Sequence, residues 1–214
     1  MTDKNQLFAR YPALYACKSQ IQAALQWMVQ TAKSGNKFLL CGNGGSCADC
    51  AHITGELMKE FLCKRPIPKQ DANRLEQLFP KDAAYMRETL QQAVPAISLM
   101  EQTAALTAYA NDVCADMAYA QMVYGYGTPG DLLICISTSG SSNNILYAAK
   151  AAKLKGMHVM GMTGSADCPL HALCDTYIAV PARQTYQVQE NHLPVYHFLC
   201  AALERELFGK EAGR

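Results

Sequence analysis

The chain has 214 residues and a formal net charge of +1, with half of its residues hydrophobic and 17% charged. This composition is enough for a sizeable core and excludes disorder as the main state. No run of lysine and arginine marks a nucleic-acid site, and no apolar run is long enough for a membrane span or a secretory signal. We therefore expect a cytoplasmic protein with neither nucleic-acid nor membrane partners.

The predicted elements alternate between short apolar runs and helix-like stretches. In chain order they are a helix over 12–34, a strand over 38–41, a helix over 46–62, a weaker strand over 96–99, a strand over 132–137, a helix over 141–155, strands over 158–163 and 176–180, and a helix over 185–208. Continuously apolar strands separated by helices predict a parallel sheet covered on both faces. This is a doubly wound α/β fold, in which ligands bind beyond the carboxyl ends of the strands.

The segment 63–95 differs from the rest of the chain because it is charged and contains several prolines. It shows one amphipathic helical pattern, near 82–93. We interpret it as a helical insertion into a single domain that covers 1–214.

Ten cysteines are scattered along the chain, most of them within apolar segments. In a cytosolic chain of this size they are more often small buried hydrophobic residues than disulfides. Cys47 and Cys50 have CxxC spacing, which leaves a redox or zinc role open. No second CxxC pair completes a cysteine-rich zinc site, so we favour the packing role.

Two strand ends carry the residue types that bind phosphate. "CGNGGS" follows the strand 38–41, and its glycines allow a ligand to approach the backbone while Ser46 opens the next helix with free N–H groups. "STSGSSN" follows the strand 132–137 and places several hydroxyl groups at the start of a helix. The alternatives are a tight turn without a ligand and ordinary capping by serine. A cap needs only one hydroxyl, so we favour a phosphate site.

Two helices carry candidate metal or acid–base groups. His52 and Glu56 are four residues apart and share a helix face, whereas Gln189, His192 and His197 lie in the last helix. Taken alone, the first pair indicates a surface hydrogen bond, and a single histidine is usually structural. Together, the histidine, glutamate and glutamine side chains suit zinc with mixed nitrogen and oxygen ligands. Sequence spacing does not show that the two helices meet.

These motifs together resemble one known family. "CGNGGS", "AHITGEL", "NDVCADM", "ISTSGSSNN" and "QENH…YH" are similar in order and spacing to the sugar isomerase (SIS) domain, and most similar to its phosphoheptose isomerase branch. The resemblance extends from the first helix to about Phe208. It implies a flavodoxin-like, five-stranded parallel sheet flanked by helices, assembled as a homotetramer or homodimer. It also implies conversion of sedoheptulose 7-phosphate to D-glycero-D-manno-heptose 7-phosphate by enediol proton transfer, with one zinc ion per subunit.

The resemblance further implies roles for single residues. Glu56 and His197 match the catalytic positions. The metal-ligand positions match His52, Glu56, Gln189 and His197. The substrate-binding positions match Asn43, Gly44, Gly45, Ser46, Asp112, Ser137, Thr138, Ser139, Ser142 and Gln189.

Some positions depart from the family's pattern, and they bear on the substrate more than on the reaction type. Glu60 stands where the family has an arginine, and Tyr186 and Gln187 replace a common Asp-Arg pair. Pro194 lies inside the last predicted helix, where it marks either a kink or the first turn.

Two alternatives to the heptose enzyme remain. One is a non-catalytic SIS module that binds a sugar phosphate or a protein partner, such as a replication initiator. The presence of Glu56 and His197 favours the enzyme over this module. The other is isomerisation of a different sugar phosphate.

Overall fold

Five parallel strands form the centre of the fold. The computed structural model describes residues 4–209. The strands are β1 (Phe38–Gly42), β2 (Ala96–Ser98), β3 (Leu132–Ile136), β4 (His158–Thr163) and β5 (Thr176–Ala179). They run in the order β2-β1-β3-β4-β5, and every neighbouring pair is parallel. The predicted five-stranded α/β fold is therefore confirmed.

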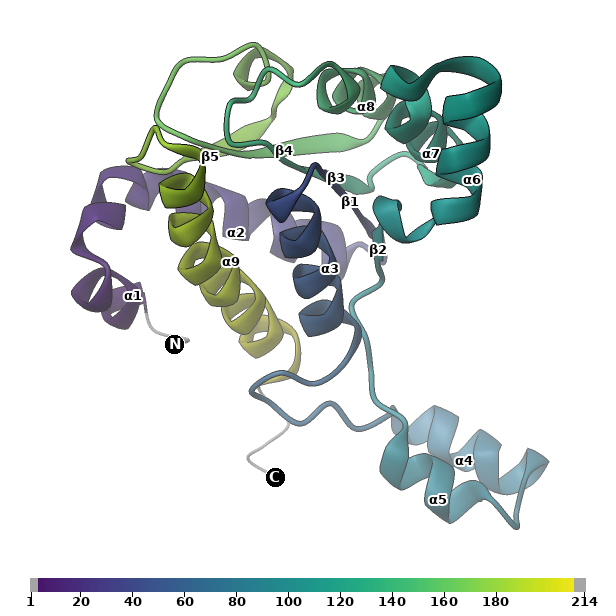
Figure 1. Cartoon of the computed structure of the whole chain (residues 1–214). Coiled ribbons are helices and arrows are strands. Elements are labelled where there is room, and N and C mark those ends of the chain that lie inside the picture. Colours follow the sequence, from purple (N-terminus) through teal and green to yellow (C-terminus); the bar gives the residue numbers. More distant parts are fainter. Residues whose placement is uncertain (1–3, 210–214) are drawn as a thin grey trace.

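Helices cover both faces of this sheet (Figure 1). They are α1 (Lys4–Arg10), α2 (Lys18–Lys33), α3 (Gly45–Met58), α4 (Lys69–Leu78), α5 (Ala83–Thr89), α6 (Thr103–Tyr109), α7 (Ala118–Tyr126), α8 (Asn143–Leu154) and α9 (Thr185–Phe208). Single 3-10 turns lie at Pro12–Cys17, Leu99–Glu101, Ala115–Met117 and His171–Leu173, and a π-helical turn lies at Ala110–Cys114. Among the helices of residues 4–209, none combines the length and the apolar character needed to cross a bilayer.

The alternation of side chains along the strands divides the core in two. In β1, Phe38 and Leu40 pack with α1, α2, α3 and α9, whereas Leu39 and Cys41 pack with α6, α7 and α8. Because successive side chains of a strand point to opposite faces, a strand that is apolar at every position can bury both of its faces. This explains why the strands read as unbroken apolar runs.

The predicted strands agree with the structure to within one residue at each end, and the last predicted helix coincides with α9. Pro194 lies inside α9, beyond its first turn. The predicted helix over 12–34 begins instead as a 3-10 turn. The prediction missed α1 and the helical stretch from α6 to α7.

The insertion contains two helices, not the single one predicted near 82–93. α4 and α5 form a hairpin that stands away from the sheet (Figure 1). α4 buries none of its residues and α5 buries only Ala83. The hairpin leaves Phe79 and Tyr85 exposed.

A buried ion pair joins the C-terminal ends of α3 and α9. Arg65 Nε donates to Glu204 Oε1 at 2.7 Å, and neither side chain is exposed to solvent. The Glu204 carboxylate also accepts hydrogen bonds from the backbone N–H groups of residues 61, 62 and 63. Arg65 donates its remaining bonds to the carbonyls of Glu56 and Leu57, at the last turn of α3. The pair therefore fixes the distance between the two helices.

Removing one partner of this pair should destabilise the fold strongly. Glu204→Ala leaves the Arg65 guanidinium buried without its counter-charge, and we expect a loss of about 3–5 kcal/mol in the free energy of unfolding. Glu206→Ala is the matched control, because Glu206 is exposed on the same helix, and it should cost less than about 0.5 kcal/mol. Urea unfolding at one protein concentration measures both. If the two variants lose the same free energy of unfolding, the Arg65–Glu204 ion pair does not have the structural role assigned to it.

Candidate metal centre and phosphate pocket

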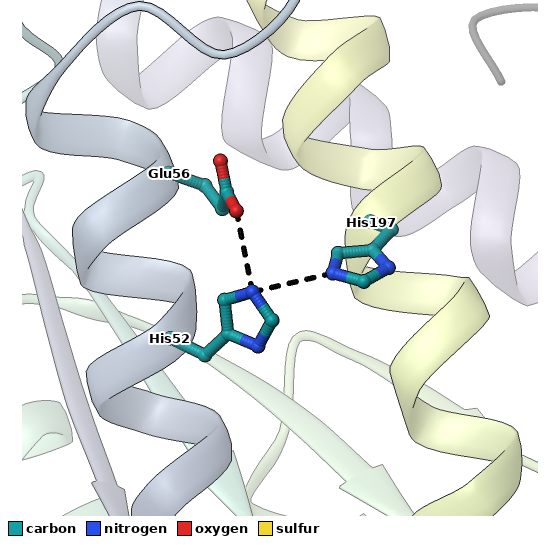
Figure 2. A group of neighbouring side chains, drawn as sticks. All are labelled: His52, Glu56 and His197. Atoms are coloured by element: carbon teal, nitrogen blue, oxygen red, sulfur yellow. Dashed lines mark hydrogen bonds and ion pairs between the residues drawn. The ribbon is translucent and has the colours of Figure 1, made fainter.

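Three side chains from α3 and α9 meet at one point (Figure 2). His52 Nε2 lies 3.2 Å from Glu56 Oε1 and 3.3 Å from His197 Nε2. One ligand atom from each residue lies within 4.8 Å of the other two. The four-residue spacing on α3 produces the first contact, as the sequence indicated. The second contact joins residues 145 positions apart.

The separations of His52 Nε2 from Glu56 Oε1 and from His197 Nε2 fit a zinc ion. Zinc in proteins is tetrahedral, with bonds of about 2.0–2.1 Å to histidine nitrogen and carboxylate oxygen, so neighbouring ligand atoms lie about 3.3 Å apart. Both contacts of His52 match that separation. Two ring nitrogens and one carboxylate oxygen that face a common centre also have the chemistry of a zinc donor set.

The surroundings favour the neutral, metal-binding form of one histidine. Partial burial lowers the pKa of His197, the neighbouring His52 lowers it further, and Glu56 opposes the shift. A histidine binds a metal through its unprotonated nitrogen, so a lowered pKa keeps His197 competent at neutral pH.

The opposite edge of His52 contacts Tyr196, which in turn contacts Asp49. Tyr196 Oη lies 3.0 Å from His52 Nδ1 and 3.2 Å from Asp49 Oδ1. Burial raises the pKa of Asp49, while the Tyr196 hydrogen bond and the nearby His52 oppose the shift. Burial also raises the pKa of Tyr196, so its hydroxyl stays protonated at neutral pH.

The two serine- and glycine-rich loops form one pocket. β1 and β3 are adjacent in the sheet, so the loops at their carboxyl ends meet. The pocket has a volume of about 280 Å³. Its lining consists of Asn43, Gly44, Gly45, Ser46, Ile136, Ser137, Thr138, Ser142, Thr185 and Gln189.

Gly45 and Gln189 are in close contact across this pocket. A Cβ atom added at Gly45 would lie 2.5 Å from Gln189 Nε2, so a larger residue there would displace the amide from its present position. Asn43 and Asn144 exchange two side-chain hydrogen bonds, of 3.0 and 2.8 Å, which tie the first loop to the start of α8.

Ser139 and Asp112 are exposed and lie outside the lining of this pocket. Asp112 occupies the π-helical turn, where its carboxylate accepts a hydrogen bond from Asn111. A neighbouring, mostly apolar pocket of about 290 Å³ shares Asn43 with the first and includes Ala110, the first residue of that turn, and Ala115, which follows the turn. Asp112 therefore lies near the same end of the sheet as the loops.

His192 faces away from the candidate metal centre. It is fully buried, and its Nε2 lies 3.3 Å from the carbonyl oxygen of Thr163. Burial lowers its pKa to about 4, so it is neutral in the folded protein. The structure assigns His192 to the core, which is the usual role of a histidine on an apolar helix face.

Several residues that shape the site left little or no sign in the amino-acid pattern. Asp49 precedes His52 by three positions and so shares its helix face, which was a usable signal. Nothing in the sequence singled out Tyr196, which is buried in the structure. Nothing in the sequence linked Arg65 to Glu204, which are 139 positions apart. Cys47 and Cys50 are free thiols, and Cys50 is buried, which agrees with a packing role.

Comparisons with known proteins identify the fold and the family. A family model for the SIS domain matches residues 76–164. The phosphoheptose isomerase of Maridesulfovibrio salexigens is 37% identical over 174 residues, which make up 81% of this chain and 72% of that protein. The phosphoheptose isomerase of Burkholderia pseudomallei is 35% identical over 191 residues, which make up 89% of this chain and 84% of that protein.

Solved structures agree with these relatives. A phosphoheptose isomerase from Francisella tularensis superposes with a TM-score of 0.72 at 26% identity, covering 96% of this chain and all of that one. The phosphoheptose isomerase from Neisseria gonorrhoeae superposes with a TM-score of 0.67 at 28% identity, covering 94% of this chain and 98% of that one. The fold is thus that of a SIS-domain protein. Within that class, the chain belongs to the phosphoheptose isomerase family.

His192 should make stability depend on pH. Its pKa is about 4 in the folded chain and near 6.5 in the unfolded chain, so below about pH 6.5 only the unfolded chain takes up the proton. The contribution of neutral His192 to the free energy of unfolding is complete above pH 6.5 and is lost as the pH falls toward 4. Between pH 7 and pH 5 we expect the free energy of unfolding to fall by about 2 kcal/mol.

Urea unfolding at both pH values, compared between the wild type and His192→Leu, isolates this effect. The variant should lack this part of the pH dependence. An identical pH dependence in the two proteins would show that His192 is not the residue responsible.

Proposed function

We propose that this chain is a ketose–aldose isomerase that converts sedoheptulose 7-phosphate to D-glycero-D-manno-heptose 7-phosphate. The observation that carries the proposal is the meeting of His52, Glu56 and His197 at the α3–α9 contact, in a member of the phosphoheptose isomerase family. The phosphate pocket lies at the N-terminal end of the same helix α3. One helix therefore connects phosphate binding to the reacting groups.

The pocket residues bind the phosphate and orient the sugar. Ser46, Ser137, Thr138 and Ser142 offer neutral hydroxyl donors, and the first turns of α3 and α8 offer backbone N–H groups. Ser139 and Asp112 are proposed to contact the substrate from outside the pocket lining. Phosphate binding fixes the carbonyl end at the reacting groups, which lowers the barrier without any contact to the reacting carbons.

Glu56 and His197 move the proton between the two carbons. Isomerisation removes a proton from the carbon next to the carbonyl and returns one to the former carbonyl carbon. A carboxylate and an imidazole that face the same space can share these two transfers. We assign the transfers to the pair as a unit.

We propose that His52, Glu56, Gln189 and His197 hold one zinc ion per subunit. When bound, zinc would polarise the substrate carbonyl and stabilise the negative charge that develops on its oxygen. Gln189 is the proposed fourth ligand, and in the described structure its side chain lies against Gly45.

Incubation with sedoheptulose 7-phosphate, followed by NMR, tests the reaction. The purified protein should produce heptose 7-phosphate. Chelator treatment should abolish turnover, and added zinc should restore it.

Glu56→Gln should reduce turnover by about 10²–10⁴-fold with unchanged circular dichroism. A wild-type protein that binds the substrate without converting it would indicate a binding module instead, and full activity without metal would exclude the zinc role.

We also propose that the chain works as a single SIS domain, located in the cytoplasm and assembled as a homotetramer or homodimer. All ten cysteines lie within the described residues and are free thiols, which supports a reducing compartment. The α4–α5 hairpin supports assembly. Its groove of about 260 Å³ is lined by Ile67, Asp71, Arg74, Leu75, Leu78 and Leu90. Segment 69–89 carries four basic and four acidic residues, a balance that suits contact with another copy of itself.

Polar substitutions on the hairpin should weaken this assembly. Phe79 and Tyr85 are 50% and 73% exposed. We expect the double variant Phe79→Ser/Tyr85→Ser to shift the mass measured by light scattering toward the 23.4 kDa of one chain. Leu154→Ser is the control, since Leu154 is 76% exposed on α8. An oligomer that survives the double variant would rule out the hairpin as a main contact.

A further inference from the structure

Behind the proposed metal ligand His52 lies a short chain of polar groups. His52 Nδ1, Tyr196 Oη and Asp49 Oδ1 follow one another at 3.0 and 3.2 Å. Asp49 and His52 share a face of α3, and Tyr196 comes from α9. The tyrosine is buried. Its ring packs edge-on against the rings of both His52 and His197.

The proton positions in this chain follow from the direction in which His52 faces. Its Nε2 points toward Glu56 and His197, so in a metal-bound neutral ring Nε2 has no proton and Nδ1 carries it. Nδ1–H then donates to Tyr196 Oη. The tyrosine has one hydroxyl proton, which remains for Asp49 Oδ1.

The Asp49 carboxylate makes few hydrogen bonds. Asp49 Oδ2 is buried without a hydrogen-bond partner, and among the described residues the Tyr196 hydroxyl is the group that donates to Asp49 Oδ1. A half-buried carboxylate with a single hydrogen-bond donor is costly to keep charged. Metal-binding histidines commonly give their second N–H to a carboxylate, and here a tyrosine stands between the two.

We propose that Tyr196 and Asp49 are positioning residues that hold His52 in the tautomer whose Nε2 is free to bind the metal. The proposal rests on the metal centre of the proposed function and adds a requirement for the tyrosine hydroxyl. It assigns neither residue a contact with substrate.

Zinc affinity without substrate tests the proposal, because it does not depend on turnover. We expect Tyr196→Phe, which keeps the ring and removes the hydroxyl, to weaken zinc binding about 10–100-fold in competition with a chelator dye. Tyr119→Phe is the matched control. Tyr119 is also a buried tyrosine whose hydroxyl donates a hydrogen bond, in its case to the Gly42 carbonyl, and its loss should leave zinc affinity unchanged.

We call the hydrogen-bonded chain from His52 through Tyr196 to Asp49 the relay. A double-mutant cycle separates the effect of the relay on zinc affinity from a general loss of stability. If the two residues act through one chain, Asp49→Ala should weaken zinc binding by about as much as Tyr196→Phe, and the double variant should be no weaker than either single one. Asp49→Asn, which keeps an acceptor oxygen, should recover part of the affinity. In nitrogen-15 NMR of the zinc-bound wild type, the His52 proton should lie on Nδ1.

The outcomes distinguish this proposal from the function. Unchanged zinc affinity in Tyr196→Phe, fully additive effects in the cycle, or a proton on Nε2 of zinc-bound His52 would each overturn the relay. A wild type that binds zinc but does not convert the sugar phosphate would overturn the isomerase assignment, and the affinity difference between Tyr196→Phe and wild type would still decide the relay. A wild type that binds no zinc would overturn the relay and the zinc site together.

Discussion

The contact between α3 and α9 is the constraint on which the proposed chemistry depends. One helix supplies His52 and Glu56 and the other supplies His197, so a small change in their separation would dissolve the cluster. The Arg65–Glu204 pair fixes that separation at the C-terminal end of α3, where Arg65 binds the carbonyl of Glu56 itself. A buried ion pair adds little net stability, because both charges lose their hydration, but breaking it is costly. We infer that its role is to specify the position of the helices.

The order of the strands explains why the two loops form one pocket, which we propose binds phosphate. After β1 the chain builds β2 on one side and then returns to build β3 on the other. The strand order thus reverses beside β1, and such a switch point is where open α/β sheets bind ligands. Both serine- and glycine-rich loops leave the sheet there, one into α3 and the other into α8. The sequence predicted each loop, but the adjacency of β1 and β3 is a property of the folded sheet.

The strands were predictable because burial on both faces makes them continuously apolar, and a helix such as α9 is long enough to show its pattern. The stretch from α6 to α7 gave no such pattern, because most residues of α6 are exposed and a π-helical turn and a 3-10 turn shift the phase of the side chains. The hairpin hid its first helix for a similar reason, since α4 buries nothing. In the site, the His52–Glu56 contact followed from helical spacing, whereas the contact with His197 required two distant helices to pack.

The two histidines of α9 show how the fold separates residues that look alike in sequence. His192 and His197 are five positions apart, which corresponds to a rotation of about 140° around the helix axis. The first therefore points toward β4, where it meets the Thr163 carbonyl, and the second points toward α3. Tyr196 lies next to His197 in the chain and contacts both His52 and Asp49 on α3. The chemistry of α9 is thus set by which of its faces turns toward α3, and a polar residue on any other face becomes part of the core or of the surface.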